Sequence, residues 1–303
     1  MTAPLVSVAI PLYRSRPFVD RIARNIESLD YPSVEILISD RHMDDDAIEL
    51  LGSRFAGDPR IRLLRANDRA GWVEHYNLLL RAATGSYALW MPHDDEYSPG
   101  YIVALVECLE QFPDTVLAFG SVEVEDETGA VIWAEEARPG IPVDGSWGPG
   151  AALGMMMLGG RWLPHFHGLF RRAPVVQAGL FVRPTADNVE ADVYWVFGMG
   201  LLGRMRFVSG CSYRKHLHGA NVSLGWGSRR FRHVRDSVTV PWGYVRDHAR
   251  GNGDILRAIP VLVAWMALRA TGSLTHSWRW PSTKERARAK GLLRRFLAVL
   301  ADR

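Results

Sequence analysis

Residues 71–96 read GWVEHYNLLLRAATGSYALWMPHDDE, and this stretch predicts an amphipathic helix followed by a buried strand. Apolar residues recur at helical spacing after the glycine, and Thr84-Gly85 is typical of a helix end. Residues 86–91 form a short, mostly apolar run, as expected for a strand that is buried on both faces. Three acidic residues then follow the carboxyl end of that strand, which is where open α/β sheets bind their ligands.

These acidic residues include the adjacent carboxylates Asp94 and Asp95. Adjacent carboxylates repel each other, so holding them together requires a cation or a solvated loop. The pair therefore indicates a divalent metal ion that is also bound by phosphate oxygens. The alternative is an acidic turn that leads into a helix at Ser98-Pro99.

The composition is that of a globular protein with a sizeable core, since 48% of the 303 residues are hydrophobic and 10% are aromatic. Cys108 and Cys211 are far apart and match no metal-binding spacing, which favours packing roles in a reducing compartment. No apolar run approaches the roughly 20 residues that span a bilayer, and no basic segment precedes the first apolar residues. We therefore expect a soluble, cytoplasmic protein.

The chain before residue 100 alternates between strands and helices. Residues 6–12, 34–39 and 61–64 are apolar or β-branched runs that predict strands, and residues 17–29 predict the first helix. The second strand delivers Asp40 to the sheet edge that also receives the acidic residues. This alternation implies right-handed crossovers between parallel strands. The expected fold class is α/β, with a mostly parallel central sheet flanked by helices.

Several segments resemble the family 2 glycosyltransferases, which have the GT-A fold. Those on the donor side are VSVAIPLYRSRPFVDRIARNIESL (6–29), YPSVEILISDRHMDD (31–45) and the opening stretch extended to residue 102. Those on the acceptor side are HGLFRRAPVVQAGLF (167–181), VEADVYWVFGMGLLGRMRFV (189–208) and HGANVS (218–223). The matching features occur in the family's order, which makes the resemblance more specific than any single motif.

The resemblance covers about residues 4–223 and implies a division of the chain. Residues 1–223 would form the GT-A catalytic domain, with a donor-binding half at about 1–100 and an acceptor half at about 101–223. Residues 224–303 would be a basic, helical C-terminal extension. Family members are inverting enzymes that use a nucleotide-sugar donor, usually with Mg²⁺ or Mn²⁺, so the resemblance implies the same donor class and metals here.

The donor-binding residues that the resemblance implies are Pro11, Tyr13, Asp40, Gly71, Asn77, Asp94 and Asp95. Asp40 would accept a hydrogen bond from the base, Tyr13 would stack on or flank it, and Asp94 would bind the metal. Gly71 and Asn77 would lie near the donor sugar or its pyrophosphate. Ordinary alternatives remain, because Tyr13 could pack at a strand end, Asp40 could form a turn and Asn77 could cap or pack its helix.

The sequence departs from the family pattern at the metal site. Many members have Asp-x-Asp-Asp where this chain has Pro92-His93-Asp94-Asp95, so the first aspartate, often a ribose contact, is absent. His93 could be a borderline metal ligand or a donor to phosphate, and an exposed turn histidine is the more ordinary interpretation.

The general base of the family is an acid at the start of an acceptor-side helix. Asp192 best matches that position, with Glu190 as its rival, and an inverting transfer needs one such carboxylate to take the proton of the acceptor hydroxyl. The alternative is that both acids simply favour a helix N-terminus through its dipole.

Further site residues come from the histidines and aromatic residues of the acceptor half. His218 fits the family's C-terminal HG-x-N-like ending, whereas His216 fits an Arg-x-His spacing, so only one of them is expected at the metal. Trp162, His167 and Gly168 are the predicted acceptor-binding residues, although an aromatic segment here could equally cover the core.

The C-terminal extension carries most of the positive charge. Residues 224–303 contain 16 Arg and Lys against 5 acidic residues, in a chain whose net charge is +3. Ile255–Ala270 and a basic amphipathic stretch near the C-terminus predict helices. Residues 284–303 could lie on an anionic membrane at the inner face, but we favour packing on the acid-rich remainder of the chain.

Three functions are consistent with these patterns. The favoured one is a metal-assisted inverting glycosyltransferase acting on a saccharide, lipid-linked or small-molecule acceptor. The second is a GT-A-like nucleotide-sugar-binding protein with weak catalysis, suggested by the missing aspartate. The third, a nucleic-acid-binding protein using the Arg-rich tail, has no recognised nucleic-acid fold to support it, so no nucleic-acid partner is expected.

Overall fold

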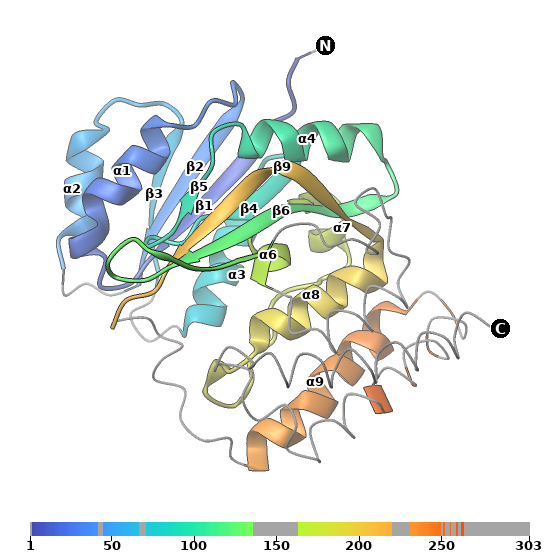
Figure 1. The fold of residues 1–303 in the computed structure, drawn as a ribbon. Coiled ribbons are helices and arrows are strands. Elements are labelled where there is room, and N and C mark those ends of the chain that lie inside the picture. The colour runs from blue at the N-terminus through green and yellow to red at the C-terminus, as the bar shows by residue number, and fades with distance from the viewer. Residues whose placement is uncertain are drawn as a thin grey trace.

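The structure is a computed structural model. It describes residues 2–41, 45–66, 71–135, 163–219 and 231–249, together with residues 251, 255, 259, 262 and 263. Within these ranges the chain forms one nine-stranded sheet in the order β3-β2-β1-β4-β8-β6-β9-β5, with β7 paired to β6 (Figure 1). The strands are β1 Val6–Leu12, β2 Val34–Asp40, β3 Ile61–Arg65, β4 Tyr87–Trp90, β5 Glu96–Tyr97, β6 Thr115–Glu125, β7 Val131–Glu135, β8 Leu169–Arg171 and β9 Arg204–His216.

Helices cover both faces of the sheet (Figure 1). They are α1 Val19–Glu27, α2 Ala47–Arg54, α3 Trp72–Ala82, α4 Tyr101–Gln111, α6 Leu163–Phe166, α7 Arg172–Gln177, α8 Ala191–Leu202 and α9 Phe231–His248, with 3-10 turns η1 Arg16–Phe18 and η2 Ala186–Asn188. One hydrophobic cluster joins α1, α2 and α4 to the sheet, and a second joins α3, α8 and α9 to its other face. Helices on both faces cover the central strands β1, β2 and β4, which are buried along their whole length.

The donor half has the predicted parallel sheet. β1 pairs in parallel with β2 and β4, and β2 pairs in parallel with β3. Every residue of β1, β2 and β4 is buried, whereas β3 lies at the edge and leaves Leu63 46% exposed. The carboxyl ends of these strands therefore meet at one edge, where Leu12 lies opposite Asp40 and Asp40 opposite Arg65.

The acceptor half completes the sheet with mixed pairing. β8 runs antiparallel to both β4 and β6, while the long strands β6 and β9 run parallel to each other. The two-residue strand β5 pairs antiparallel with β9, so that Glu96 lies opposite Arg214. This pairing brings the end of β9 against the acidic segment after β4.

Two helical predictions differ from the structure. The helix expected from residue 17 begins as the 3-10 turn η1, because the Phe18 amide donates to the Ser15 carbonyl three residues back, and α1 proper starts at Val19. Helix α9 lies in the extension expected to be helical, but no helix was predicted at these residues, whose β-branched side chains, Pro241 and Gly243 have low helix propensity.

Packing on α8 accounts for α9. Tyr244 and Val245 are fully buried, and the Tyr244 ring lies so close to Gly198 of α8 that a Cβ there would be 2.9 Å from it. α9 thus shares the core of the acceptor half. Residues 284–303 lie outside the described residues, as does most of Ile255–Ala270. No helix in the part of the chain that the structure describes is long and apolar enough to cross a membrane.

Candidate active site

A cavity of about 540 Å³ lies at the carboxyl ends of β2 and β3. Its lining residues are Arg16, Asp40, Asp45, Asp46, Ile48, Glu49 and Arg65. Asp40 closes β2 and is 5% exposed, and it lies in register with Arg65. Arg16 pairs with Asp46 at 2.7 Å, and Arg65 pairs with Glu49 at 2.8 Å. The cavity is thus bordered by paired charges at the sheet edge predicted to bind the donor base.

Tyr13 directly follows Leu12, which lies opposite Asp40 of the cavity lining, and two arginines lie near the Tyr13 ring. The guanidinium carbon of Arg41 is 4.2 Å from the ring centroid, and that of Arg14 is 5.4 Å away. Pro11 is buried within β1 opposite Ser39. Arg14 has a φ of 52°, a left-handed conformation that is uncommon for a residue with a side chain. The Tyr13 face is therefore a planar surface bordered by cations at the strand end.

Asp94 and His218 come together from opposite halves of the chain. The Oδ2 atom of Asp94 is 3.0 Å from Nε2 of His218, and the Asp94 carbonyl accepts a hydrogen bond of 2.6 Å from Arg21. Burial alone would raise the pKa of Asp94, but the hydrogen bond to His218 and the nearby Lys215 charge hold it well below its usual value. Asp94 is therefore an ionised carboxylate, although it is only 9% exposed.

Phe18 lies against the two histidines beside Asp94. Its ring stacks on His93 at 5.0 Å and lies 4.9 Å from the ring of His218. Nδ1 of His93 is also 2.6 Å from Oγ of Ser15. The interpretation of His93 as an exposed turn residue was wrong, because this packing leaves only 16% of its side chain exposed. His93 therefore supports the position of the Asp94 segment.

Asp95 turns the other way and is completely buried. Its Oδ1 accepts a 3.0 Å hydrogen bond from the His216 amide, its Oδ2 accepts one from the Tyr213 hydroxyl, and Lys215 Nζ is 3.6 Å from Oδ2. Burial raises the pKa of Asp95 despite the Lys215 charge. These contacts tie the strand end to β9, so Asp95 has a structural role whatever else it does.

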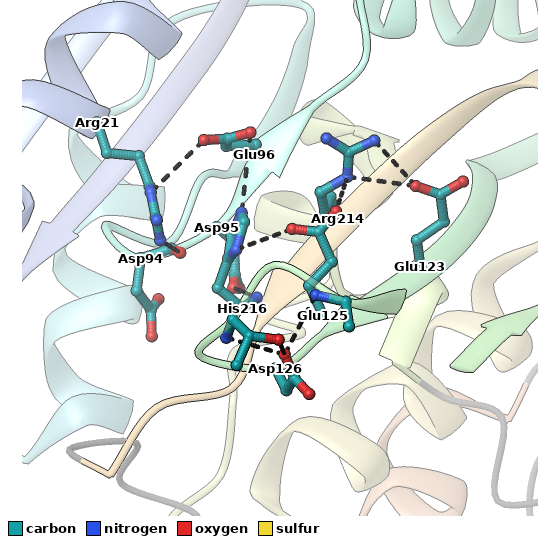
Figure 2. A network of polar contacts seen from close by, with 11 residues as sticks. Arg21, Asp94, Asp95, Glu96, Glu123, Glu125, Asp126, Arg214 and His216 are labelled. Atoms are coloured by element: carbon teal, nitrogen blue, oxygen red, sulfur yellow. Dashed lines mark hydrogen bonds and ion pairs between the residues drawn. The ribbon is translucent and has the colours of Figure 1, made fainter. Parts of the chain in front are cut away.

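The His216 ring lies among acidic residues other than Asp94, although its backbone amide bonds Asp95. Figure 2 shows it with Glu96 from β5, Glu125 from β6 and Arg214 from β9. Its Nδ1 is 3.3 Å from Glu125 and its Nε2 is 3.8 Å from Glu96. Of the two candidate histidines, His218 is thus the one whose ring faces Asp94.

The two candidate bases occupy different environments at the start of α8. Glu190 precedes the helix with a φ of 61°, and its Oε2 accepts a 2.9 Å hydrogen bond from the Tyr194 hydroxyl. Asp192 is 8% exposed, and its Oδ1 has no hydrogen-bond partner. Burial, reinforced by the nearby Glu190 charge, raises the pKa of Asp192 to about 7. A carboxylate in this state exchanges protons near neutral pH.

Electrostatic effects connect Asp192 to the Asp94 side of the site. The charge of Lys215 influences the pKa values of both carboxylates, and burial raises the pKa of Tyr76 with added contributions from Asp94 and Asp192. Conversely, although burial alone would lower the pKa of Lys215, Asp95 and Asp94 raise it. Lys215 is therefore a fixed cation near both carboxylates.

Two predicted donor-site residues have packing explanations. Both polar atoms of the Asn77 side chain bond the Val182 backbone, at 2.8 and 2.9 Å, which supports the packing alternative for this residue. Gly71 is the N-cap of α3, and a Cβ there would lie 2.7 Å from Oε2 of Glu74 and 2.9 Å from the side-chain Nδ2 of Asn188. The glycine thus lets the turn before α8 contact the start of α3.

Of the three predicted acceptor-binding residues, the structure describes His167 and Gly168. His167 stacks on Tyr213 at 4.3 Å with an interplanar angle of 18°, and burial lowers its pKa to about 3, so it is neutral. A Cβ on Gly168 would lie 2.4 Å from the Ala118 carbonyl oxygen, so close strand packing explains this glycine. Trp162 lies outside the described residues.

Sequence reasoning missed Phe18, Tyr76 and Asn188 at this site. Phe18 and Tyr76 look like ordinary helix residues in the sequence, and only the fold places them against His93, His218 and Trp90. Asn188 had a weak signal, since asparagine tolerates the left-handed conformation that it adopts at φ 55°.

Comparison with known proteins identifies the family. The model for "Glycosyl transferase family 2" matches residues 7–171, which is more than half of the chain. The chain belongs to glycosyl transferase family 2. Family membership confirms the sequence resemblance and makes the protein a glycosyltransferase, an enzyme of nucleotide-sugar-dependent glycosyl transfer.

Similar proteins support the fold of this family 2 member. An uncharacterised protein of Mycobacterium tuberculosis (strain CDC 1551 / Oshkosh) is 27% identical over 274 residues, covering 88% of this chain and 83% of that protein. S. aureus TarS 1-349, solved with UDP-GlcNAc, has a TM-score of 0.65 at 13% identity and covers 95% and 80% of the two chains. The mannosyltransferase PcManGT from Pyrobaculum calidifontis, solved with GDP-Man and Mn²⁺, has a TM-score of 0.56 at 17% identity and covers 99% and 81%. The predicted GT-A fold is confirmed.

Proposed function

We propose that this family 2 glycosyltransferase transfers a sugar to an acceptor hydroxyl with inversion, and that Asp192 is the general base. The observation that carries the proposal is the buried Asp192 carboxylate, which keeps one oxygen unpartnered and has its pKa raised to about 7. Glu190 is less suited, because it accepts a hydrogen bond from Tyr194.

The proposed reaction is a single displacement. Asp192 takes the proton from the acceptor hydroxyl, and the hydroxyl oxygen attacks the anomeric carbon of the donor sugar. The bond from that carbon to the β-phosphate oxygen breaks as the new bond forms, and the nucleoside diphosphate departs from the opposite face. The configuration at the anomeric carbon is therefore inverted.

Asp94 and His218 are the residues that would hold a divalent metal. No cluster of three His, Cys, Asp or Glu side chains that could bind a metal occurs within the described ranges. One carboxylate and one imidazole, 3.0 Å apart, nevertheless fit Mn²⁺ or Mg²⁺ when phosphate oxygens complete the coordination. A bound metal would neutralise charge on the leaving diphosphate. Lys215 adds a fixed positive charge nearby.

The donor nucleotide is proposed to bind between the cavity at Asp40 and the start of α3. Asp40 would accept a hydrogen bond from the base, and the Tyr13 ring would lie against its face. The backbone amides at the start of α3, after Gly71, would favour the negative pyrophosphate.

The test is a donor panel followed by one substitution. Purified protein should release nucleoside diphosphate from one of a set of UDP-, GDP- and dTDP-sugars in the presence of Mn²⁺, and Asp192→Asn should bind the same donor but turn it over slowly. Specific donor binding with no turnover in the wild type under any metal condition would contradict catalysis and favour the nucleotide-sugar-binding alternative.

A further inference from the structure

The turn that leads into α8 has an unusual backbone. Asp187, Asn188 and Glu190 have φ values of 56°, 55° and 61°, so three of four consecutive residues are left-handed without being glycine. Such conformations persist only where surrounding contacts enforce them. This turn immediately precedes Asp192, and the Asn188 side chain lies so near Gly71 at the start of α3 that a Cβ on Gly71 would be 2.9 Å from its Nδ2. The geometry of the turn therefore sets where Asp192 lies relative to the donor-binding half.

Contacts within the turn and one contact from a distant helix hold it, and the backbone amides of Asn188 and Val189 donate to the carbonyls of Thr185 and Ala186 at 3.0 and 3.3 Å. Within it, the Thr185 hydroxyl donates a 2.7 Å hydrogen bond to the Val189 carbonyl. From α9, Oδ2 of Asp236 accepts a 2.6 Å hydrogen bond from the Ala186 amide. Asp236 is 5% exposed, and Arg235 donates to its other oxygen, Oδ1, at 3.0 Å. The carboxylate is thus oriented with one oxygen on the turn.

A second side chain of α9, the buried Tyr244, bonds the chain a few residues before the turn. The Tyr244 hydroxyl donates to the Phe181 carbonyl at 2.7 Å and accepts from the Arg183 amide at 3.0 Å. α9 therefore contacts the chain on both sides of residue 184, through Tyr244 before it and Asp236 after it. Of these two side chains, Asp236 is the one that bonds the left-handed turn. α9 lies beyond the residues matched by the family model, which end at 171.

We propose that Asp236 is a positioning residue, which holds the 186–190 turn in its left-handed conformation and so places Asp192 for proton transfer. The proposal rests on the proposed role of Asp192. It gives one residue of α9 an indirect role in proton transfer, through the turn that precedes Asp192. Loss of this hydrogen bond would affect the rate more than the stability, because a shift of the turn would also shift Asp192. Misplacing a reacting group by about 1 Å can lower the rate roughly 100-fold.

Three variants test the proposal. Asp236→Ala removes the acceptor, Asp236→Asn keeps an oxygen that can accept from Ala186, and Asp247→Ala is the matched control. Asp247 is another α9 carboxylate, which pairs with Arg183 at 2.8 Å and does not contact the turn. Backbone hydrogen exchange of residues 185–192 is measured on each full-length variant. Exchange should accelerate in Asp236→Ala, remain near wild type in Asp236→Asn and be unchanged in Asp247→Ala.

Turnover gives the functional half of the test, using hydrolysis of UDP-GlcNAc or GDP-mannose, whichever the wild type cleaves. Asp236→Ala should lower kcat by roughly 10- to 100-fold with little change in the donor KM, and Asp236→Asn should restore most of the loss. Unchanged exchange or kcat in Asp236→Ala, an equal loss in Asp236→Asn, or loss of donor binding together with global unfolding would overturn the proposal. If the wild type cleaves neither donor, the proposed function is in question, whereas the exchange measurement still decides whether Asp236 holds the turn.

Discussion

Replacing Asp192 with asparagine should lower turnover and, at neutral pH and above, should also stabilise the folded protein. Burial raises the pKa of Asp192 from its ordinary value of 3.8 to about 7. For a carboxyl group with a raised folded-state pKa, the stabilising contribution is fully present below the unfolded-state pKa and is lost as the pH rises through the folded-state value. At 1.36 kcal/mol per pKa unit, the difference corresponds to an upper limit of roughly 4 kcal/mol above pH 7.

Asparagine cannot ionise, so Asp192→Asn should escape this loss. Its free energy of unfolding, measured by urea denaturation with tryptophan fluorescence, should exceed that of the wild type by a margin that grows between pH 5 and pH 8. Over the same range, kcat of the wild type should rise through about pH 7, because the base must be ionised to accept a proton. In Asp192→Asn, kcat should be lower by roughly 10²- to 10⁴-fold, with donor binding intact.

Glu190→Gln is the control, since it neutralises an acid at the same helix start and keeps an acceptor for the Tyr194 hydroxyl. It should retain more turnover than Asp192→Asn and lack the pH-dependent gain in stability. The reasoning fails if Asp192→Asn is no more stable than the wild type at pH 8 and keeps its turnover. A large loss confined to Glu190→Gln would identify Glu190 as the base.

Two further predictions concern the metal and the tail. Asp94→Asn and His218→Ala should each weaken Mn²⁺-dependent donor binding by roughly 10- to 100-fold in calorimetric titrations, whereas His216→Ala, whose ring lies with Glu96 and Glu125, should change it little. If His216→Ala and His218→Ala weakened Mn²⁺-dependent donor binding equally, the assignment of His218 rather than His216 to the metal would be wrong. Deleting residues 284–303 should lower the melting temperature, because a basic tail and an acid-rich remainder attract each other. An unaltered melt together with lost sedimentation on anionic vesicles would instead indicate a membrane contact.

The donor half could be predicted because its signals are local. Buried parallel strands read as mostly apolar runs, and the chain supplies such runs at residues 6–12, 34–39 and 86–91, each within a residue or two of the observed strand. Asp40 and Asp94 follow from these strand ends, since parallel strands present their carboxyl ends at one edge.

The acceptor half could not be predicted in the same way, because its contacts depend on residues far apart in the chain. Lys215 is brought to Asp95 by the antiparallel pairing of β5 with β9. The register of that pairing cannot be predicted from the sequence, because β5 has only two residues. α9 forms against its own propensity, because α8 offers a buried surface with a glycine where Tyr244 packs.

The Asp94-Asp95 pair shows what a local pattern leaves undetermined. The repulsion between adjacent carboxylates indicated one shared cation, but the structure separates the two side chains. Asp95 is buried against Tyr213, the His216 amide and Lys215, whereas Asp94 faces His218. All of these partners lie more than 100 residues later in the chain. The different environments of Asp94 and Asp95 are therefore determined by β9 and the residues that follow it. One carboxylate thereby holds the strand end in place, and the other remains available at the site where a diphosphate and its metal would bind.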